Sequence, residues 1–322
     1  MNRKADAIIV GAGVIGSAVA FELAKRGYKT LNIDKLPTSG YGSTSNSCAI
    51  VRAHYSTWDG VAMAYEGFHY WDNWADYLGV DDERGLIKYM KTGSIMFKLQ
   101  GEDHSKKCLS FFEEIGVEHE IWDLDKLKEK MPIYSHDQYD GTTRPDEDDN
   151  FFDKTGKKIE GAVYTPGSGY VSDPQLSSHN LQVATEAKGG EFLFNSEITE
   201  IRQENGKVLG VTLSTGEQID SPVVVNVAGP HSFVINRMAG VEEEMNIKTN
   251  ALRHEVHHVP SPDGFNFEEK GCHTSDGDNF IYFRPETGNT ILIGSEDPKC
   301  DPLEWVADPD DYNNQITESQ WK

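Results

Sequence analysis

The sequence has 322 residues, of which 37% are hydrophobic, and its 53 acidic and 30 basic residues give a formal net charge of −23. Such a charge repels nucleic-acid phosphates and anionic lipid, so we expect neither as a partner. The length allows a large core and predicts two domains, and no apolar run approaches the roughly 20 residues of a membrane span.

Two features favour a cytoplasmic protein. The basic start of the chain resembles the first part of a signal peptide, but the apolar stretch after it runs into a glycine turn that a secretory segment would not carry. The cysteines are scattered with no CxxC pair, which favours reduced thiols over a zinc knuckle or a disulfide framework. They are Cys48, Cys108, Cys272 and Cys300.

The first predicted elements are a strand at Ala7–Val10, a helix over Ser17–Arg26 and a strand at Tyr28–Ile33. Between the first strand and the helix lies Gly11-Ala12-Gly13-Val14-Ile15-Gly16, a GxGxxG pattern. Asp34 follows 18 residues after its last glycine, where a dinucleotide site needs a carboxylate for the ribose hydroxyls. An ordinary βαβ crossover with incidental glycines is the alternative.

Each glycine of this pattern has a physical task in a dinucleotide site. Gly11 makes the tight turn, Gly13 lets the main chain approach a pyrophosphate, and Gly16 lets the helix lie close to the strand. The phosphate charge is then held at the helix N-terminus.

The sequence between residues 58 and 130 predicts three helices and one strand. Apolar residues at three- and four-residue spacing predict one long amphipathic helix over Trp58–Leu78. A strand is expected at Gly93–Leu99, and helices at Ser105–Ile115 and Leu124–Lys130. Residues 135–160 are polar and acidic, and we interpret them as a surface insertion.

The second half begins with a helix from Asp173-Pro174 to Lys188. The strands after it are expected to complete the first sheet. The last predicted strands, at Asn250–Val259 and Asn279–Ile293, belong to another sheet, and the chain ends in a polar stretch. The strands assigned to the first sheet are Glu191–Phe194, Ile198–Gln203, Lys207–Leu213 and Val223–Val227.

A rival chemistry comes from residues 254–258, His254-Glu255-Val256-His257-His258, which satisfy the HExxH pattern of zinc proteases. That pattern holds a metal only on a helix, where residues four apart share one face. Two prolines, Pro260 and Pro262, follow at once and favour a strand, on which residues four apart are separated by roughly 13 Å. We therefore expect no metal site.

Four motifs in order resemble the D-amino-acid oxidase superfamily of FAD-dependent oxidoreductases, and within it the branch of sarcosine oxidase and dimethylglycine dehydrogenase. The resemblance covers about residues 5 to 295. The motifs are Gly11–Gly16, the Gly42–Asn46 loop leading to Ile50-Val51-Arg52, Gly169–Pro174, and Val223–Ser232 with its Ala228-Gly229.

The resemblance implies FAD as cofactor. It implies that Asp34 holds the adenine ribose, that the loop 43–47 lies along the flavin, that Ile198 lies near the adenine, and that the main chain passes the cofactor at Ala228-Gly229. The cofactor-binding residues expected on this basis are Gly11, Gly13, Val14, Ile15, Gly16, Asp34, Lys35, Ser43, Thr44, Asn46, Ser47, Ile198, Ala228 and Gly229.

The chain departs from the family at three points. Nothing after Gly294 resembles the family's later glycine-rich flavin segment, so we expect the chain to lack it. Asn46 stands where the dimethylglycine dehydrogenase branch carries a histidine for covalent attachment, which implies non-covalent FAD. Ile291-Leu292-Ile293 stands where monomeric sarcosine oxidases place an oxygen-activating lysine, which favours a dehydrogenase over an oxidase.

Three residues are candidates for the substrate side. Arg52 suits a substrate carboxylate, because a guanidinium binds that group with two hydrogen bonds and the family has an arginine here; a structural ion pair is the alternative. Tyr282 and Arg284 lie on a predicted strand and are candidates to line the substrate face, or they belong to a packed strand.

The fold expected is α/β, with a Rossmann-like FAD-binding domain and a mainly antiparallel-sheet substrate domain. The first domain is assigned to residues 1–60 and 161–240, and the second to 61–160 and 241–322. The expected reaction is oxidation of the C–N bond of a small amino acid or N-methylated amine by hydride transfer to flavin. A flavin-binding protein or assembly factor without catalysis is the alternative. The amine, the electron acceptor and the oligomeric state stay open.

Overall fold

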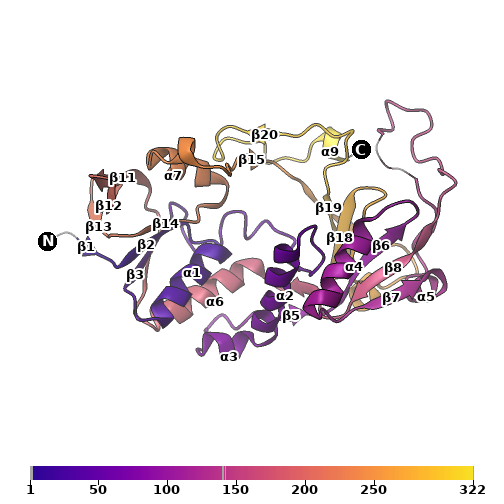
Figure 1. Cartoon of the computed structure of the whole chain (residues 1–322), viewed down its shortest axis with the longest axis horizontal. Helices are drawn as coiled ribbons and strands as arrows, with labels where there is room; N and C mark the ends of the chain where they lie inside the picture. Colours follow the sequence, from indigo (N-terminus) through magenta and orange to yellow (C-terminus); the bar gives the residue numbers. More distant parts are fainter. Residues whose placement is uncertain (1–2, 140, 142, 322) are drawn as a thin grey trace.

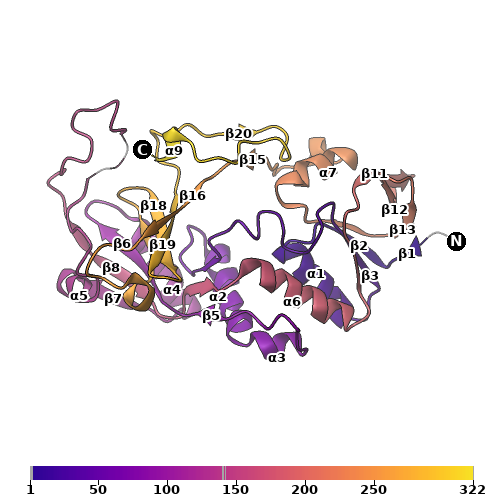
Figure 2. The ribbon, with the colours of Figure 1, turned by 180° about the vertical axis from the view of Figure 1, so that it is seen from behind.

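The computed structural model describes residues 3–139, 141 and 143–321. Figures 1 and 2 show an elongated molecule with a β-rich part toward each end. Helices connect the two parts: α1 (Val14–Lys25), α2 (Trp58–Asp72), α3 (Trp74–Leu78) and α6 (Pro174–Glu186).

A parallel four-stranded sheet, in the order β10-β3-β2-β14, forms the base of the N-terminal part. Every residue of β2 and β3 is buried, as expected for a parallel sheet covered on both faces. The helix α1 packs against one face through Ala20, beside Ala7 and Ile9. The strand–glycine turn–helix–strand unit predicted from the sequence is thereby confirmed. The strands are β2 (Ala7–Val10), β3 (Thr30–Ile33), β10 (Glu191–Leu193) and β14 (Val224–Asn226).

The other face of this sheet is covered by a second four-stranded sheet, in the order β1-β13-β12-β11. Ile198 and Val211 of this second sheet pack against Ile8 and Val10. The expectation that the strands at 198–213 complete the first sheet was therefore wrong, because they pair with one another across the Asn205-Gly206 turn instead. The strands are β1 (Arg3–Lys4), β11 (Ile198–Glu204), β12 (Lys207–Leu213) and β13 (Gln218–Asp220).

The opposite part is built on a seven-stranded sheet, in the order β16-β19-β18-β17-β6-β8-β7. All its strand pairs are antiparallel except β17 with β6, which confirms the mainly antiparallel second sheet. The strands are β6 (Ser94–Leu99), β7 (Glu120–Asp123), β8 (Ile159–Thr165), β16 (Val256–Pro260), β17 (His273–Asp276), β18 (Ile281–Glu286) and β19 (Thr290–Ser295).

Helices cover both faces of the seven-stranded sheet. Leu127 of α5 (Leu124–Lys130) and Phe267 of α8 (Phe267–Lys270) pack on one face, and Phe112 of α4 (His104–Ile115) packs on the other. The strand β8 starts before the expected domain boundary at residue 161 and pairs within this sheet. The division of the chain into two discontinuous domains stays a prediction.

Short elements connect the two parts. A three-stranded sheet in the order β4-β9-β5 joins Ile50–Val51 (β4), Gly169–Val171 (β9) and Tyr89–Met90 (β5). A two-stranded ladder pairs β15 (Ala251–Leu252) with β20 (Trp305–Val306). The remaining elements are α7 (Ser232–Met238), α9 (Glu318–Trp321) and the 3₁₀ turns at Gly229–His231 and Glu242–Glu244.

The long helix predicted over Trp58–Leu78 is two helices in the structure, which is a correction. Asn73 separates α2 from α3, and its side-chain amide donates a hydrogen bond of 2.8 Å to the His69 carbonyl oxygen. Such side-chain bonds compete with the helical pattern of the main chain. On either side of the break, Phe68 and Trp74 pack in different hydrophobic clusters.

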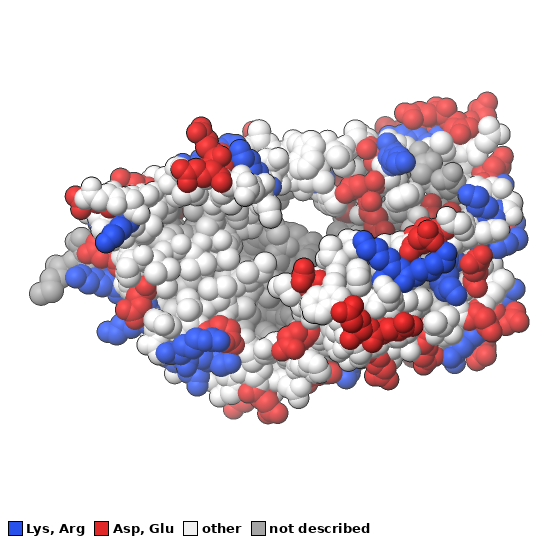
Figure 3. Space-filling view, in the orientation of Figure 1, with Lys and Arg blue, Asp and Glu red and all other residues white. Residues whose placement is uncertain are grey.

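The segment 135–160 has little regular structure apart from an isolated bridge between Asp137 and Lys158 and the start of β8; the prediction for its residues 140 and 142 lies outside the described part. Figure 3 shows charged side chains crowded over the part of the molecule that carries β6–β8, whereas the face below α7 is largely uncharged. In the described ranges, no helix combines the length and the apolar character needed to cross a bilayer.

Candidate cofactor site and substrate face

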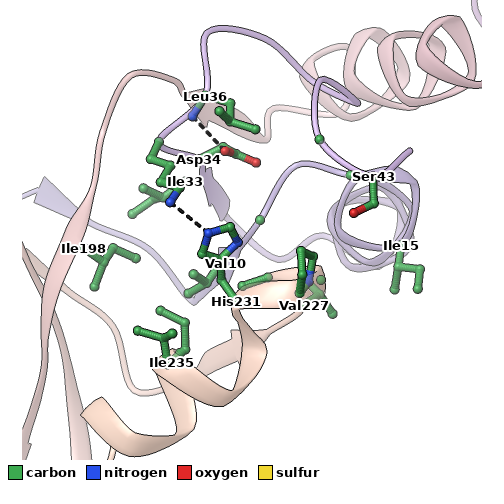
Figure 4. Close-up of a pocket in the computed structure, with 18 of the residues that line it drawn as sticks. Val10, Ile15, Ile33, Asp34, Leu36, Ser43, Ile198, Val227, His231 and Ile235 are labelled. Atoms are coloured by element: carbon green, nitrogen blue, oxygen red, sulfur yellow. Dashed lines mark hydrogen bonds between the residues drawn. The ribbon is translucent and has the colours of Figure 1, made fainter. Parts of the chain in front are cut away.

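A cavity of about 330 Å³ lies where the carboxyl ends of β2, β3 and β14 meet the glycine turn and α7. Ligands of open parallel sheets bind at this position. Figure 4 shows that its walls are largely apolar, with Ile198 and Ile235 on one side and Ile15 on the other. Polar groups enter it from Asp34 and His231.

The glycine turn leaves no room for a side chain at Gly11 or at Gly16. Gly11 has a φ of 104°, and a Cβ there would meet the Val227 carbonyl oxygen at 2.6 Å. A Cβ on Gly16 would meet the Gly11 carbonyl oxygen at 1.9 Å. The Val14 amide, at the start of α1, donates to the Thr44 hydroxyl at 3.1 Å. The N-terminus of α1 lines the cavity at Gly13, Val14 and Ile15, and the partial positive charge of a helix N-terminus favours a diphosphate there.

Asp34 holds the glycine turn in place. Its Oδ2 accepts a hydrogen bond of 2.7 Å from the Ala12 amide, and its Oδ1 accepts one of 2.9 Å from the Leu36 amide. A carboxylate offers about four acceptor positions, so two remain for the hydroxyls of a ribose. The carboxylate at this strand end, the glycine cradle and the apolar walls together fit the adenosine diphosphate half of FAD.

Most of the predicted cofactor residues line this cavity, and three do not. Gly16 lies beneath the turn. The Asn46 amide donates to the Gly42 carbonyl oxygen at 3.1 Å, and the Ser47 hydroxyl accepts from the Ala49 amide at 3.1 Å. Both side chains thus stabilise their own loop. The predicted residues that line the cavity are Gly11, Gly13, Val14, Ile15, Asp34, Lys35, Ser43, Thr44, Ile198, Ala228 and Gly229.

Sequence reasoning missed the polar cluster at one side of the cavity. His231 Nε2 lies 3.0 Å from Lys35 Nζ and 3.1 Å from an oxygen of Asp310, which also forms an ion pair with Lys35. The hydrogen bond from Lys35 holds the pKa of Asp310 below its ordinary value. His231 comes two residues after the Ala228-Gly229 motif, and this closeness in the sequence could have indicated a residue of the cofactor site. Asp310 follows Lys35 by 275 residues and carries no motif.

On the substrate side, Arg284 is buried and bonded in several directions. Its Nε donates to the Cys48 carbonyl oxygen at 2.5 Å, its Nη1 to the Pro285 carbonyl oxygen at 2.6 Å, and its Nη2 pairs with Glu286 at 2.9 Å. The guanidinium also lies 4.1 Å from the centre of the Tyr170 ring. Arg284 therefore connects β18 to the loop between β3 and β4.

Tyr282 lies beside the same loop. Its hydroxyl is 3.9 Å from the Cys48 thiol, and burial raises the pKa of Tyr282 above its ordinary value. The phenol is therefore neutral at physiological pH.

Arg52 is half-buried, with its guanidinium 5.1 Å from the centre of the Tyr55 ring. Beside it, the buried imidazoles of His54 and His273 stack with their centres 5.6 Å apart. His273 Nδ1 shares a hydrogen bond of 2.8 Å with the Ser94 hydroxyl, whereas the buried Nε2 of His54 has no hydrogen-bond partner among the described residues.

Both histidines of this pair are neutral at physiological pH. Burial, assisted by the positive charges of Arg52 and Arg284, lowers the pKa of His273 to about 3. Burial also holds the pKa of His54 well below its ordinary value, with Arg52 acting in the same direction. The positive charge at this place therefore belongs to Arg52 and not to the imidazoles.

The HExxH segment does not form the helix that a zinc protease needs. Its last three residues lie in β16, and just before that strand Glu255 pairs with Arg253 at 2.8 Å and His254 pairs with Asp297 at 3.3 Å. Within the described ranges, no group of three or more histidine, cysteine or carboxylate side chains has the geometry of a metal site. The strand expected from Pro260 and Pro262 is confirmed.

A family model described as FAD dependent oxidoreductase matches residues 6–320. Glycine oxidase from Geobacillus kaustophilus is 26% identical over 310 residues, which cover 92% of this chain and 71% of that protein. Sarcosine oxidase subunit beta from Rhodobacter capsulatus is 27% identical over 243 residues, 74% of this chain and 53% of that one. The mitochondrial pyruvate dehydrogenase phosphatase regulatory subunit of mouse is 24% identical over 302 residues, 92% of this chain and 30% of that one.

Solved structures agree in fold. L-proline dehydrogenase from P. horikoshii superposes with a TM-score of 0.73 at 19% identity, over 92% of this chain and 70% of that one. Glycine oxidase from Geobacillus kaustophilus gives a TM-score of 0.70 at 21% identity, over 98% and 75%. Since the family model covers nearly the whole chain, the protein belongs to the FAD dependent oxidoreductase family, and its relatives include the glycine and sarcosine oxidases of the branch that the motifs indicated.

Proposed function

We propose that the protein holds FAD without a covalent bond and oxidises the C–N bond of a small amino acid or N-methylated amine. The observation that carries this proposal is the cavity at the carboxyl ends of β2 and β3, where the glycine turn, the N-terminus of α1 and Asp34 converge. When bound, the flavin supplies the acceptor for the hydride that leaves the carbon beside the nitrogen. The relatives named glycine oxidase and sarcosine oxidase support this substrate class.

In this proposal the main chain at Gly13–Gly16 binds the pyrophosphate and Asp34 binds the adenine ribose. Ile198 packs near the adenine, and the loop 43–47 together with Ala228-Gly229 passes the flavin side. Asn46 carries an amide, which forms no flavin bond of the histidine type, and it is already bonded to Gly42.

Arg52 is the proposed ligand of the substrate carboxylate. Its guanidinium lies over the Tyr55 ring, and no acidic side chain pairs with it among the described residues. The neutral His54 and His273 beside it leave its charge unshared, which suits the binding of one carboxylate. Tyr282, from β18, is proposed to line the same face, whereas the bonds of Arg284 support a role in positioning the loop.

We propose a dehydrogenase over an oxidase, because β19 carries Ile291-Leu292-Ile293 and no lysine at the place that the family resemblance assigns to oxygen activation. The electron acceptor is a separate molecule that the residues do not identify.

The test is an anaerobic titration of the FAD-loaded protein with sarcosine, dimethylglycine and glycine, followed by flavin absorbance. Bleaching by at least one amine is expected, and Arg52→Lys should raise the substrate concentration for half-bleaching by about tenfold or more, because lysine cannot form the two-pronged bond. Yellow protein that no amine bleaches would contradict the enzymatic proposal.

A non-catalytic flavin protein is the second candidate, favoured by one observation. A relative named as a phosphatase regulatory subunit aligns over 92% of this chain. The same titration separates the two candidates, since only a flavin-binding protein without catalysis stays yellow with every amine and is still reduced by dithionite.

A further inference from the structure

The chain beyond β19 returns to the cofactor side of the molecule. Figures 1 and 2 show it running from the seven-stranded sheet toward α7, through β20, and back to α9. Residues 304–317 of this segment, which we name the clasp, contain almost no regular secondary structure apart from β20. Its position is set by the β15–β20 ladder near one end and otherwise by contacts of side chains.

The two ends of the clasp are fixed by buried charges. Arg253 pairs with Glu304 at 2.8 Å and donates to the Gln315 carbonyl oxygen at 2.5 Å and to the Asn313 carbonyl oxygen. Glu255 accepts bonds from the Thr317 amide at 3.0 Å and from its hydroxyl at 2.6 Å. The side chains of Arg253 and Glu255 are each 6% exposed and pair with each other. The glutamate of the HExxH segment thus has a structural task.

The ionised state of Glu255 is favoured by this arrangement. Burial alone would raise its pKa, but the hydrogen bonds from Thr317 and Arg253 outweigh burial and lower it. The ends of the clasp stay tied at physiological pH.

The middle of the clasp reaches the cofactor cavity through Asp310. Its carboxylate contacts Lys35 and His231, and both of these side chains line the cavity. Asp310 is itself 58% exposed, while the side chains of Lys35 and His231 are 28% and 24% exposed. One carboxylate from the far end of the sequence therefore fixes two polar cavity groups that come from different strand ends.

We propose that Asp310 latches the clasp over the cofactor cavity, and that this latch slows the dissociation of FAD. The inference rests on the proposed function in one respect only, which is that FAD occupies this cavity. It adds His231 and Asp310 to the residues that govern cofactor binding.

An isolated exposed ion pair contributes little, because ordering two long side chains offsets most of the attraction. Here the ends of the clasp are already tied by Arg253 and Glu255, so the Asp310 contact forms at a high effective concentration. We expect loss of the latch to speed FAD release by about three- to tenfold at low salt.

The test compares Asp310→Asn with Asp311→Asn in the FAD-loaded full chain. Both variants remove one negative charge from the same turn, but Asp311 forms no ion pair with any residue in the described ranges. The dissociation rate of FAD is measured from the recovery of free-flavin fluorescence after dilution, without any substrate.

Faster release from Asp310→Asn than from wild type and Asp311→Asn, with a difference that shrinks as salt is raised, supports the latch. Equal rates would overturn it. Slower release from Asp310→Asn would also overturn it, because Asp310 would then act by repelling the diphosphate. A wild-type protein that binds no FAD would instead contradict the proposed function.

Discussion

The cofactor cavity is shaped by main-chain atoms, whereas the substrate face is shaped by side chains. In the cavity, the critical contacts come from the main chain, at Gly11, Gly16 and the start of α1, where added Cβ atoms would collide with neighbouring groups. On the substrate face they come from side chains such as Arg284, which is bonded to Cys48 and Glu286. Local sequence reports main-chain geometry directly, but it reports side-chain partners only when they are already known to be neighbours.

The largest expected effect is that of Gly16→Ala, which tests the main-chain side of this comparison. The added methyl group would lie 1.9 Å from the Gly11 carbonyl oxygen and 3.2 Å from Val227 Cγ2, so α1 must move away from the turn. We expect a loss of about 3 kcal/mol or more in the free energy of unfolding, together with loss of bound FAD.

The matched control for that variant is Gly67→Ala. Gly67 lies inside α2, and a Cβ there would meet no atom within 4 Å from the other described parts of the chain. Alanine is favoured over glycine in a helix by up to about 1 kcal/mol, so this variant should be at least as stable as wild type and should keep its FAD. Chemical denaturation and the flavin-to-protein absorbance ratio measure both quantities. A Gly16→Ala protein that is yellow and stable would show that the close approach is not needed.

The same difference between main-chain geometry and side-chain contacts decides which parts of the structure the sequence predicts. The βαβ unit and the start of a helix at Asp173-Pro174 were predicted, because each depends on residues a few positions apart. The break at Asn73 was missed since apolar spacing continues through it.

Contacts between distant segments were beyond such reasoning. The hydrogen bond from Arg284 to Cys48 spans 236 residues, and the contact between Lys35 and Asp310 spans 275. Nothing in the spacing of either pair indicates that the fold brings them together. The cavity residue Asp34 was found from its spacing after the glycine turn, whereas Ile198 and Ala228 were found because a family resemblance supplied that information.

A second prediction concerns Arg284 and tests whether its bonds are structural. Arg284→Lys keeps the charge next to Glu286 but cannot also bond the carbonyl oxygens of Cys48 and Pro285. Because those acceptors are buried, we expect a loss of about 2–4 kcal/mol in the free energy of unfolding.

The control is Arg237→Lys, whose exposed pair with Glu242 at 2.6 Å should contribute less than about 1 kcal/mol. Urea denaturation of both variants gives the comparison. If Arg284 instead binds substrate directly, Arg284→Lys will unfold like wild type while the substrate concentration for half-bleaching rises.

The smallest expected effect is a pH dependence of stability that arises at His54 and His273. The folded pKa of His273 is lowered to about 3, so between its ordinary value and that point the unfolded chain binds a proton that the folded chain does not. The contribution is thus fully present above about pH 6.5 and is lost as the pH falls. At pH 5 the loss is about 2 kcal/mol for this histidine, and His54, whose pKa is lowered in the same direction, adds to it.

This pH range separates the histidines from carboxylates such as Glu255. Because the pKa of Glu255 is lowered in the fold, its contribution to stability is present above about pH 4.3 and is lost only below that pH. Burial raises the pKa of Asp276, so this carboxyl makes the fold more stable as the pH falls, which opposes the histidines. The pH dependence of each variant is therefore compared with that of the wild type. His273→Asn should flatten the change in unfolding free energy between pH 7 and pH 5, because asparagine does not titrate there, whereas His69→Asn, at an exposed position of α2, should leave it as in wild type. If the change in unfolding free energy between pH 7 and pH 5 is the same in His273→Asn as in wild type, His273 is protonated in the fold at the lower pH. Two positive charges, on Arg52 and on the imidazole, would then lie side by side.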